Sequence, residues 1–175
     1  LNKIYRAEFL KKHSLSFLPG YWFEDLDFVF RAFYFAGKIT KADGLLIGYR
    51  QRQGSIMKSI SLKILDKMAV LDKMAVFLKN EHKFQIYEEM YKLLYLKMVF
   101  SIIYSCVKTN KNKQTAREIV RKLFASDYFN KITTGHLQMG YKIKRSEQFF
   151  FSLIKLRLIN PSSISILSQL INIGR

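Results

Sequence analysis

Cysteine, proline and acidic residues are scarce in this chain of 175 residues. Its single cysteine, Cys106, excludes an internal disulfide framework, a cysteine-rich zinc site and an iron–sulfur cluster, and it fits the reducing cytoplasm. Asp and Glu total 13 against 30 Lys and Arg, so the formal net charge is +17. A charge of this size predicts an anionic partner, either nucleic acid, a phosphorylated metabolite or an acidic membrane surface.

Long apolar runs are lacking as well. No apolar stretch of signal-peptide length follows the charged first residues, which begin Leu1-Asn2-Lys3. The most apolar segment, residues 93–107, is interrupted by Lys97 and is shorter than the roughly 20 residues of a spanning helix. The sequence therefore predicts no transmembrane span. Hydrophobic residues still make up 49% of the chain, which is enough to bury a core.

Residues 1–59 predict mixed α/β structure. A first helix is expected from a cap at Asn2 to about His13. A second is expected from about Phe23 to Ala36, and its apolar residues on both sides predict that it is largely buried. Two short strands are expected after it, at 38–43 and 45–50, on either side of the turn dipeptide Asp43-Gly44.

Residues 60–175 predict a mainly α-helical extension. The region has one proline, Pro161, which suits the first turn of the last helix, and Thr115 and Ser146 are candidate N-caps. The helical patterns are separated by breaks at 110–113, 133–135 and 160–161.

An identical tandem, Leu-Asp-Lys-Met-Ala-Val, occupies residues 65–70 and 71–76. A period of six residues matches neither of the helical periods, 3.5 and 3.6. At about 100° per residue the second copy is rotated by about 240° relative to the first, so the copies cannot present the same face. The tandem therefore implies no coiled coil, and the sequence predicts no function for it.

Adjacent carboxylates follow an aromatic pair in Trp22-Phe23-Glu24-Asp25-Leu26-Asp27. In the structural interpretation, acids in a first helical turn complement the helix dipole, and Asp27 pairs with Arg31. In the functional interpretation, a carboxylate beside an aromatic wall takes a proton from an acceptor hydroxyl as general base. Asp25-Leu26-Asp27 also matches a metal-binding D-x-D, but that motif normally ends a strand, whereas this one opens a helix.

Residues 49–56, Tyr-Arg-Gln-Arg-Gln-Gly-Ser-Ile, form a second candidate site. On a strand, Arg50 and Arg52 point to the same side. Ser55 as an N-cap leaves helix N–H groups facing the same space, and two guanidinium groups beside a helix N-terminus suit a diphosphate. An exposed basic strand end with an ordinary serine cap explains these residues equally well.

Other sites have weaker signals. Lys3 and Arg6 lie on one side of the amphipathic start of the first predicted helix. The spacing of the three histidines predicts no metal site within this chain, and no Ser-His-Asp triad or glycine-rich phosphate loop is recognised. These histidines are His13, His82 and His136.

Taken in order, the segments resemble the acceptor-side half of a bacterial family 2 glycosyltransferase. The resemblance implies the GT-A fold, with Asp25 as the catalytic base of an inverting transfer and Glu24 as an acceptor contact. It also implies further substrate contacts, which are Lys3, Arg6, Trp22, Arg50, Arg52 and Ser55. The matching segments are Asn2-Lys3-Ile4-Tyr5-Arg6 with Phe9-Leu10, Phe17-Leu18-Pro19-Gly20 leading to residues 23–28, and residues 49–56.

The resemblance implies a nucleotide diphosphate sugar as donor, a glycan or lipid-linked acceptor of surface polysaccharide synthesis, and Mg²⁺ or Mn²⁺ as cofactor. The family's nucleotide-binding half, with its strand-terminal D-x-D, has no counterpart in this sequence. We therefore expect a C-terminal portion of the catalytic domain in residues 1–59, with the metal ligands outside this chain, and no activity from the chain alone.

The resemblance is silent on residues 60–175. Within them, residues 149–159 join aromatic to cationic residues. They predict either peripheral contact with the inner face of the plasma membrane or a packed helix from which Lys155 and Arg157 reach solvent. The alternative to a transferase is a non-enzymatic basic helical module that binds nucleic acid, a membrane surface or a protein. Nucleic acid is the least favoured partner, because the charges are dispersed and no nucleic-acid motif accompanies them.

Overall fold

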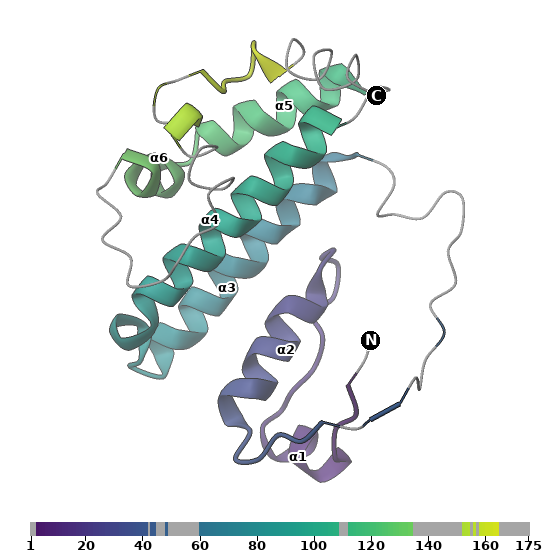
Figure 1. Cartoon of the computed structure of the whole chain (residues 1–175). Coiled ribbons are helices and arrows are strands. Elements are labelled where there is room, and N and C mark those ends of the chain that lie inside the picture. Colours follow the sequence, from purple (N-terminus) through teal and green to yellow (C-terminus); the bar gives the residue numbers. More distant parts are fainter. Residues whose placement is uncertain are drawn as a thin grey trace.

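The computed structural model describes residues 3–41, 43–44, 48, 60–108, 112–134, 152–154, 156 and 158–164. Figure 1 shows α3 and α4 side by side, with α5 and α6 on the α4 side of this hairpin and the α1–α2 pair on the α3 side. The helices are α1 (Ala7–Lys12), α2 (Glu24–Phe35), the 3-10 helix η2 (Leu62–Leu65), α3 (Asp66–Asn80), α4 (Phe84–Lys108), α5 (Lys113–Phe124) and α6 (Asp127–Thr134).

A tight turn joins α3 and α4 into an antiparallel hairpin. His82 adopts a left-handed conformation with φ of 53° after the last turn of α3. The Lys83 N–H donates to the Leu78 carbonyl at 2.8 Å and the His82 N–H donates to the Lys79 carbonyl at 3.0 Å. This is the Schellman pattern, which satisfies the free carbonyls of a helix end and reverses the chain.

Helix α4 forms the centre of the main core. It contributes eight buried residues, more than any other helix among the described residues. By length and composition α4 could also cross a membrane, which differs from the expectation of no span, because the helix begins at Phe84 and not near Leu93. Its packing between α3 and α5 is also what the core helix of a soluble protein shows.

The α1–α2 pair has a smaller core of its own, in which Leu15, Phe28 and Ala32 are buried. Helix α2 also packs on α3, where the Phe77 ring lies 5.0 Å from Tyr34 and 5.7 Å from Phe35 between centroids. The predicted α2 is therefore confirmed to within one residue at each end. It is less buried than expected, because Phe33 remains 47% exposed.

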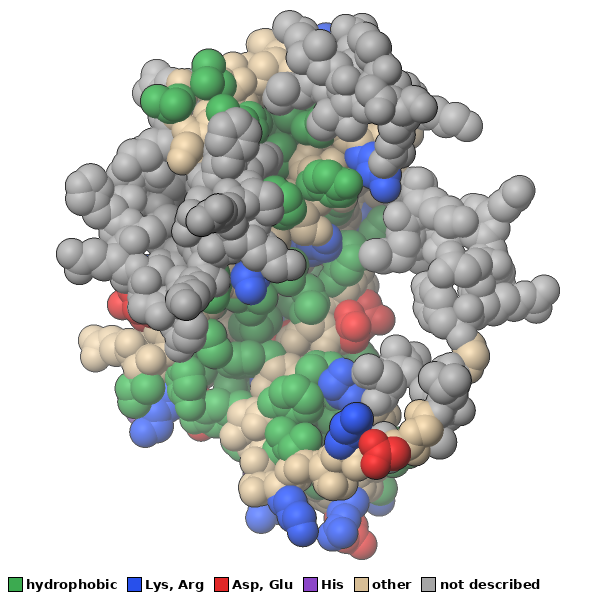
Figure 2. All heavy atoms as spheres, viewed as in Figure 1, with side chains coloured by type: hydrophobic (Ala, Val, Ile, Leu, Met, Phe, Trp, Pro, Cys, Tyr) green, Lys and Arg blue, Asp and Glu red, His purple; other side chains and the backbone are tan. Residues whose placement is uncertain are grey.

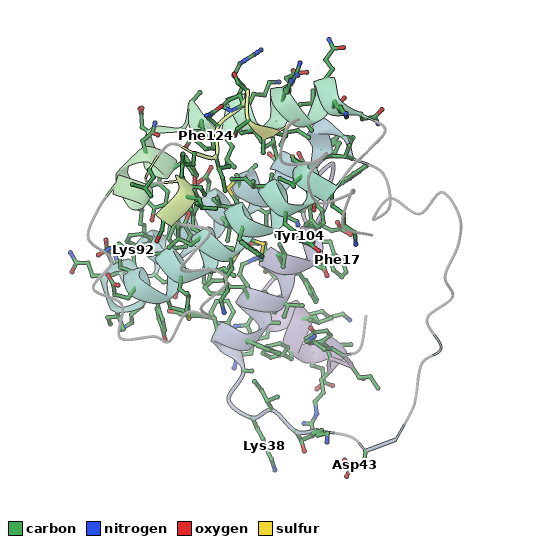
Figure 3. All side chains as sticks on the ribbon, turned by 45° about the horizontal axis from the view of Figure 1, so that its top comes forward. Phe17, Lys38, Asp43, Lys92, Tyr104 and Phe124 are labelled. Atoms are coloured by element: carbon green, nitrogen blue, oxygen red, sulfur yellow. The ribbon has the colours of Figure 1, made fainter. Side chains whose placement is uncertain are left out.

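The prediction of an α/β front part is wrong for the described residues, which contain helices and no strand. Figure 3 shows Lys38 and Asp43 on a segment that runs away from the helices. Ile39 in this segment is 63% exposed, so the alternation that suggested a strand has no buried face. A two-stranded hairpin without packing on one face is marginal in water. Most of the second predicted strand, 45–50, lies outside the described residues.

Two of the predicted helix starts differ from the structure. Helix α1 begins at Ala7, after Arg6 as its N-cap, and not near Asn2. Helix α5 begins at Lys113, so Thr115 lies inside its first turn and does not cap it. Residues 161–163 form a turn, in which the Asn160 side-chain oxygen accepts the N–H groups of Ser162 and Ser163 at 2.9 and 3.0 Å, and the rest of the helix predicted after Pro161 lies outside the described residues. The candidate cap Ser146 lies outside the described residues.

Candidate functional site

Phe23 sets the start of α2. It adopts a left-handed conformation, with φ of 65° and ψ of 27°, and its side chain caps no N–H group. The Leu26 N–H donates to the Phe23 carbonyl at 3.0 Å, which closes the first turn. A large side chain in this conformation costs on the order of 1–3 kcal/mol, so contacts around Phe23 must hold it. The conformation of Phe23 therefore sets the positions of Glu24 and Asp25, the first two residues of α2.

The acidic residues of the first turn of α2 have different surroundings. Asp27 is 2% exposed and its Oδ2 lies 2.6 Å from an Arg31 guanidinium nitrogen. The same guanidinium donates to the Ser16 carbonyl at 2.8 Å. The predicted pair of Asp27 with Arg31 is therefore confirmed, and Arg31 also connects α2 to the preceding segment. Asp25 is exposed and Glu24 is half-buried, so these two carboxylates remain accessible to a ligand.

The described residues do not fit a divalent metal. Two residues apart on a helix, Asp25 and Asp27 are separated by about 200°, and the Asp27 carboxylate is already held by Arg31. Among the residues that the structure describes, no group of three or more His, Cys, Asp and Glu side chains could hold a metal ion. No step in the function proposed below depends on a metal.

Trp22 and Phe23 are held from α3. The Trp22 N–H donates to Asp66 Oδ2 at 2.8 Å, and Lys67 Nζ lies 4.7 Å from the centroid of the Phe23 ring. Lys67 is only 9% exposed, and this burial lowers its pKa below the ordinary 10.5. Asp66 and Lys67 are not among the residues predicted from the sequence to form a site. Their only signal in the sequence is that both belong to the first copy of the tandem.

The other predicted contacts do not all gather near Asp25. Lys3 Nζ lies 5.9 Å from the Phe33 ring centroid, and Phe33 is eight residues, about 12 Å, along α2 from Asp25. The structure therefore does not place Lys3 beside the Asp25 carboxylate. Arg6 is exposed at the start of α1. The remaining three, Arg50, Arg52 and Ser55, lie outside the described residues.

Positive charge is spread over the molecule. Figure 2 shows Lys and Arg side chains dispersed over the visible face, with apolar side chains between them. Among the coloured residues of this view, the described ones, no continuous cationic stripe typical of nucleic-acid binding is seen. Comparison with protein-family models, with curated proteins and with solved structures finds no match to this chain, so the resemblance to glycosyltransferases rests on the motifs.

Proposed function

We propose that this chain belongs to an inverting glycosyltransferase and that Asp25 is its catalytic base. The observation that carries the proposal is the contrast within the first turn of α2: Asp27 is buried in an ion pair, whereas Asp25 is exposed after an aromatic pair that is itself held in place. A fixed and accessible carboxylate is what an acceptor hydroxyl needs for deprotonation.

The proposed reaction is a single displacement. The Asp25 carboxylate takes the proton of the acceptor hydroxyl while the hydroxyl oxygen attacks the anomeric carbon of the donor. The bond from that carbon to the nucleotide diphosphate breaks, and the diphosphate leaves with the bonding electron pair. The new glycosidic bond forms on the face opposite the leaving group, so the anomeric configuration inverts.

Neighbouring residues shape the acceptor side in this proposal. Glu24 is half-buried next to Asp25 and orients the acceptor, and the half-buried Trp22 supplies an apolar face for a sugar ring. Arg6 is a further contact, as is Lys3 for a part of the substrate further from the reacting hydroxyl. Arg50, Arg52 and Ser55 are proposed to bind the donor diphosphate.

The test is a transfer assay on the polypeptide encoded by the complete reading frame that contains this chain. It uses a panel of nucleotide diphosphate sugars with glycan and lipid-linked acceptors. Asp25→Asn is expected to lower kcat by at least about 10²-fold, because the general base is lost. The control is Asp127→Asn, which removes an exposed first-turn acid from α6 and so reproduces the change in helix-dipole interaction.

Two results would contradict the proposal. One is the absence of transfer from every donor of the panel by the unaltered protein. The other is equal activity of Asp25→Asn and the unaltered protein, with both folded by circular dichroism. Glu24→Gln is expected to raise the acceptor KM more than it lowers kcat, since Glu24 orients the acceptor and does not take its proton.

A second candidate function is peripheral contact with an anionic membrane surface. Within the predicted membrane-facing segment 149–159, Ile154 and Ile159 are buried, but Leu156 and Leu158 are 68% and 57% exposed. The buried isoleucines join the main core, so the segment is fixed while its leucines face outward. Apolar side chains on a strongly cationic protein suit the interface of an anionic bilayer.

Vesicle co-sedimentation tests this contact. Vesicles with about one-third anionic phospholipid are expected to bind the protein, and the double variant Leu156→Ser with Leu158→Ser is expected to bind several-fold less. The matched control is Ile86→Ser, which removes an exposed apolar side chain from α4. Equal loss of binding in the control, or binding to RNA that displaces the vesicles, would contradict the assignment.

A further inference from the structure

Four consecutive residues, Gly20 to Phe23, each contact a charged side chain of η2 or α3. Two of the four, Gly20 and Phe23, have left-handed φ values of 82° and 65°. The contacts are Lys63 Nζ donating to the Gly20 carbonyl (3.0 Å), Lys73 Nζ over the Tyr21 ring (5.3 Å), the Trp22 N–H donating to Asp66 Oδ2 (2.8 Å) and Lys67 Nζ over the Phe23 ring (4.7 Å).

Among these contacts, those of Asp66 and Lys67 are the least exposed to solvent. The Asp66 side chain is 18% exposed and also lies 3.4 Å from Lys63 Nζ. Lys67 Nζ donates to Ser101 Oγ on α4 at 2.8 Å, so a second helix fixes the ammonium group beneath the Phe23 ring. Screening by water is weak at such positions, and a cation over an aromatic ring is most favourable when it is desolvated.

We infer that Asp66 and Lys67 are positioning residues for the acceptor site, because they hold the Trp22–Phe23 turn from which Glu24 and Asp25 emerge. This inference rests on the proposed function. Neither residue touches a substrate. Each acts through the turn: Asp66 fixes the Trp22 backbone and Lys67 fixes the strained Phe23.

The inference also assigns a role to one copy of the tandem. Asp66 and Lys67 belong to its first copy, and Asp72 and Lys73 are their equivalents in the second. Asp72 is exposed and Lys73 is exposed, since the second copy is rotated by about 240°. Of the second pair, Lys73 still lies over the Tyr21 ring but is exposed, whereas the first pair is the less exposed one and contacts the Trp22–Phe23 turn directly. Asp72, which is exposed, is therefore the internal comparison for Asp66.

Trp22 makes the position of the turn measurable without any assay of activity, because it is the single tryptophan of the chain. Asp66→Ala and Lys67→Met are expected to increase the quenching of Trp22 fluorescence by acrylamide. In the transferase they are expected to lower kcat by about 10-fold to 10²-fold, with a smaller change in the acceptor KM, since the base is displaced while the binding groups remain. Asp66→Asn keeps an acceptor for the Trp22 N–H and should restore part of both properties.

The matched controls are Asp72→Ala, the tandem equivalent of Asp66→Ala, and Lys79→Met, a lysine of the same helix that lies over Phe84 and not over the turn. Both should retain the quenching and the kcat of the unaltered protein. Folding of every variant is checked by circular dichroism. Lys67→Met is only one atom shorter than lysine, so most of the space remains filled.

Unchanged quenching and kcat in Asp66→Ala and Lys67→Met would overturn the inference, as would equal effects in the two controls. If the unaltered protein transfers no sugar, the positioning role is overturned together with the proposed function. Increased quenching in the variants would then identify the contacts as structural. If the protein transfers sugar and the variants leave kcat unaltered, the proposed function stands and the positioning role alone is wrong.

Discussion

Val70 and Val76 occupy equivalent places in the two copies of the tandem, yet Val70 is fully buried and Val76 is 54% exposed. Val70→Ala should lower the free energy of unfolding by about 2 kcal/mol, because it leaves a cavity in the core. Val76→Ala should change it by less than about 0.5 kcal/mol. Urea denaturation of both variants measures the difference. Equal losses would show that the two valines have the same surroundings, contrary to the structure.

The burial of Lys67 predicts a dependence of stability on pH. Because its pKa is lowered in the folded protein, the unfolded chain binds more protons at this lysine between the lowered value and 10.5. The cost of burying the charge is therefore relieved as the pH rises through this interval, and stability increases.

Lys67→Met removes this contribution. The difference in unfolding free energy between the unaltered protein and Lys67→Met should shift in favour of the unaltered protein as the pH rises from about 7 towards 10. Urea denaturation at several pH values measures it, with Lys73→Met as the exposed control in the same helix. A difference that is constant or that shifts the other way would contradict the burial of a charged lysine.

At the scale of elements, the interface between α2 and α3 centres on Phe77. Its ring lies 5.0 Å from Tyr34, 5.7 Å from Phe35 and 6.1 Å from Phe30 between centroids. Phe77→Ala should reduce the hydrogen-exchange protection of α2 while α4 keeps its own, because the α4 core does not depend on this ring.

Tyr104→Ala is the control for this prediction, since Tyr104 is 48% exposed on α4 and stacks on Phe100. It should leave α2 protected. Equal loss of protection in α2 and α4 after Phe77→Ala would show that the two helix pairs unfold as one unit.

The elements also show what the sequence can and cannot predict. The boundaries of α2 were predictable, because its first-turn acids and apolar periodicity are local signals. The strand predicted at 38–43 is wrong for the described residues, since alternation alone does not tell whether one face becomes buried. For the candidate site, the place of Glu24 and Asp25 at a helix start was local and predictable. Asp66, 44 residues from Trp22, was not, because that contact depends on how α2 and α3 dock.

At the scale of the whole molecule, the chain carries a net charge of +17, so like charges repel one another. The six ion pairs seen within the described part of the chain each join residues four positions apart or fewer, and they act within or next to one helix or turn. Raising NaCl from about 20 mM to about 200 mM should therefore increase Tm, by about 2–4 °C for each 1 kcal/mol of repulsion that is screened. Scanning calorimetry measures this, and a falling Tm would mean that attractive pairs dominate.

The tandem also bears on how the gene for this chain can change. Loss of one copy during DNA replication would keep the reading frame and barely alter the composition. The helix, however, would shorten by about 9 Å, and everything after the deletion would turn by about 240° relative to everything before it. The side chains of α3 that contact the Trp22–Phe23 turn and those that pack on α4 would then no longer face their partners at the same time. A deletion that keeps the reading frame would therefore be expected to prevent this chain from folding.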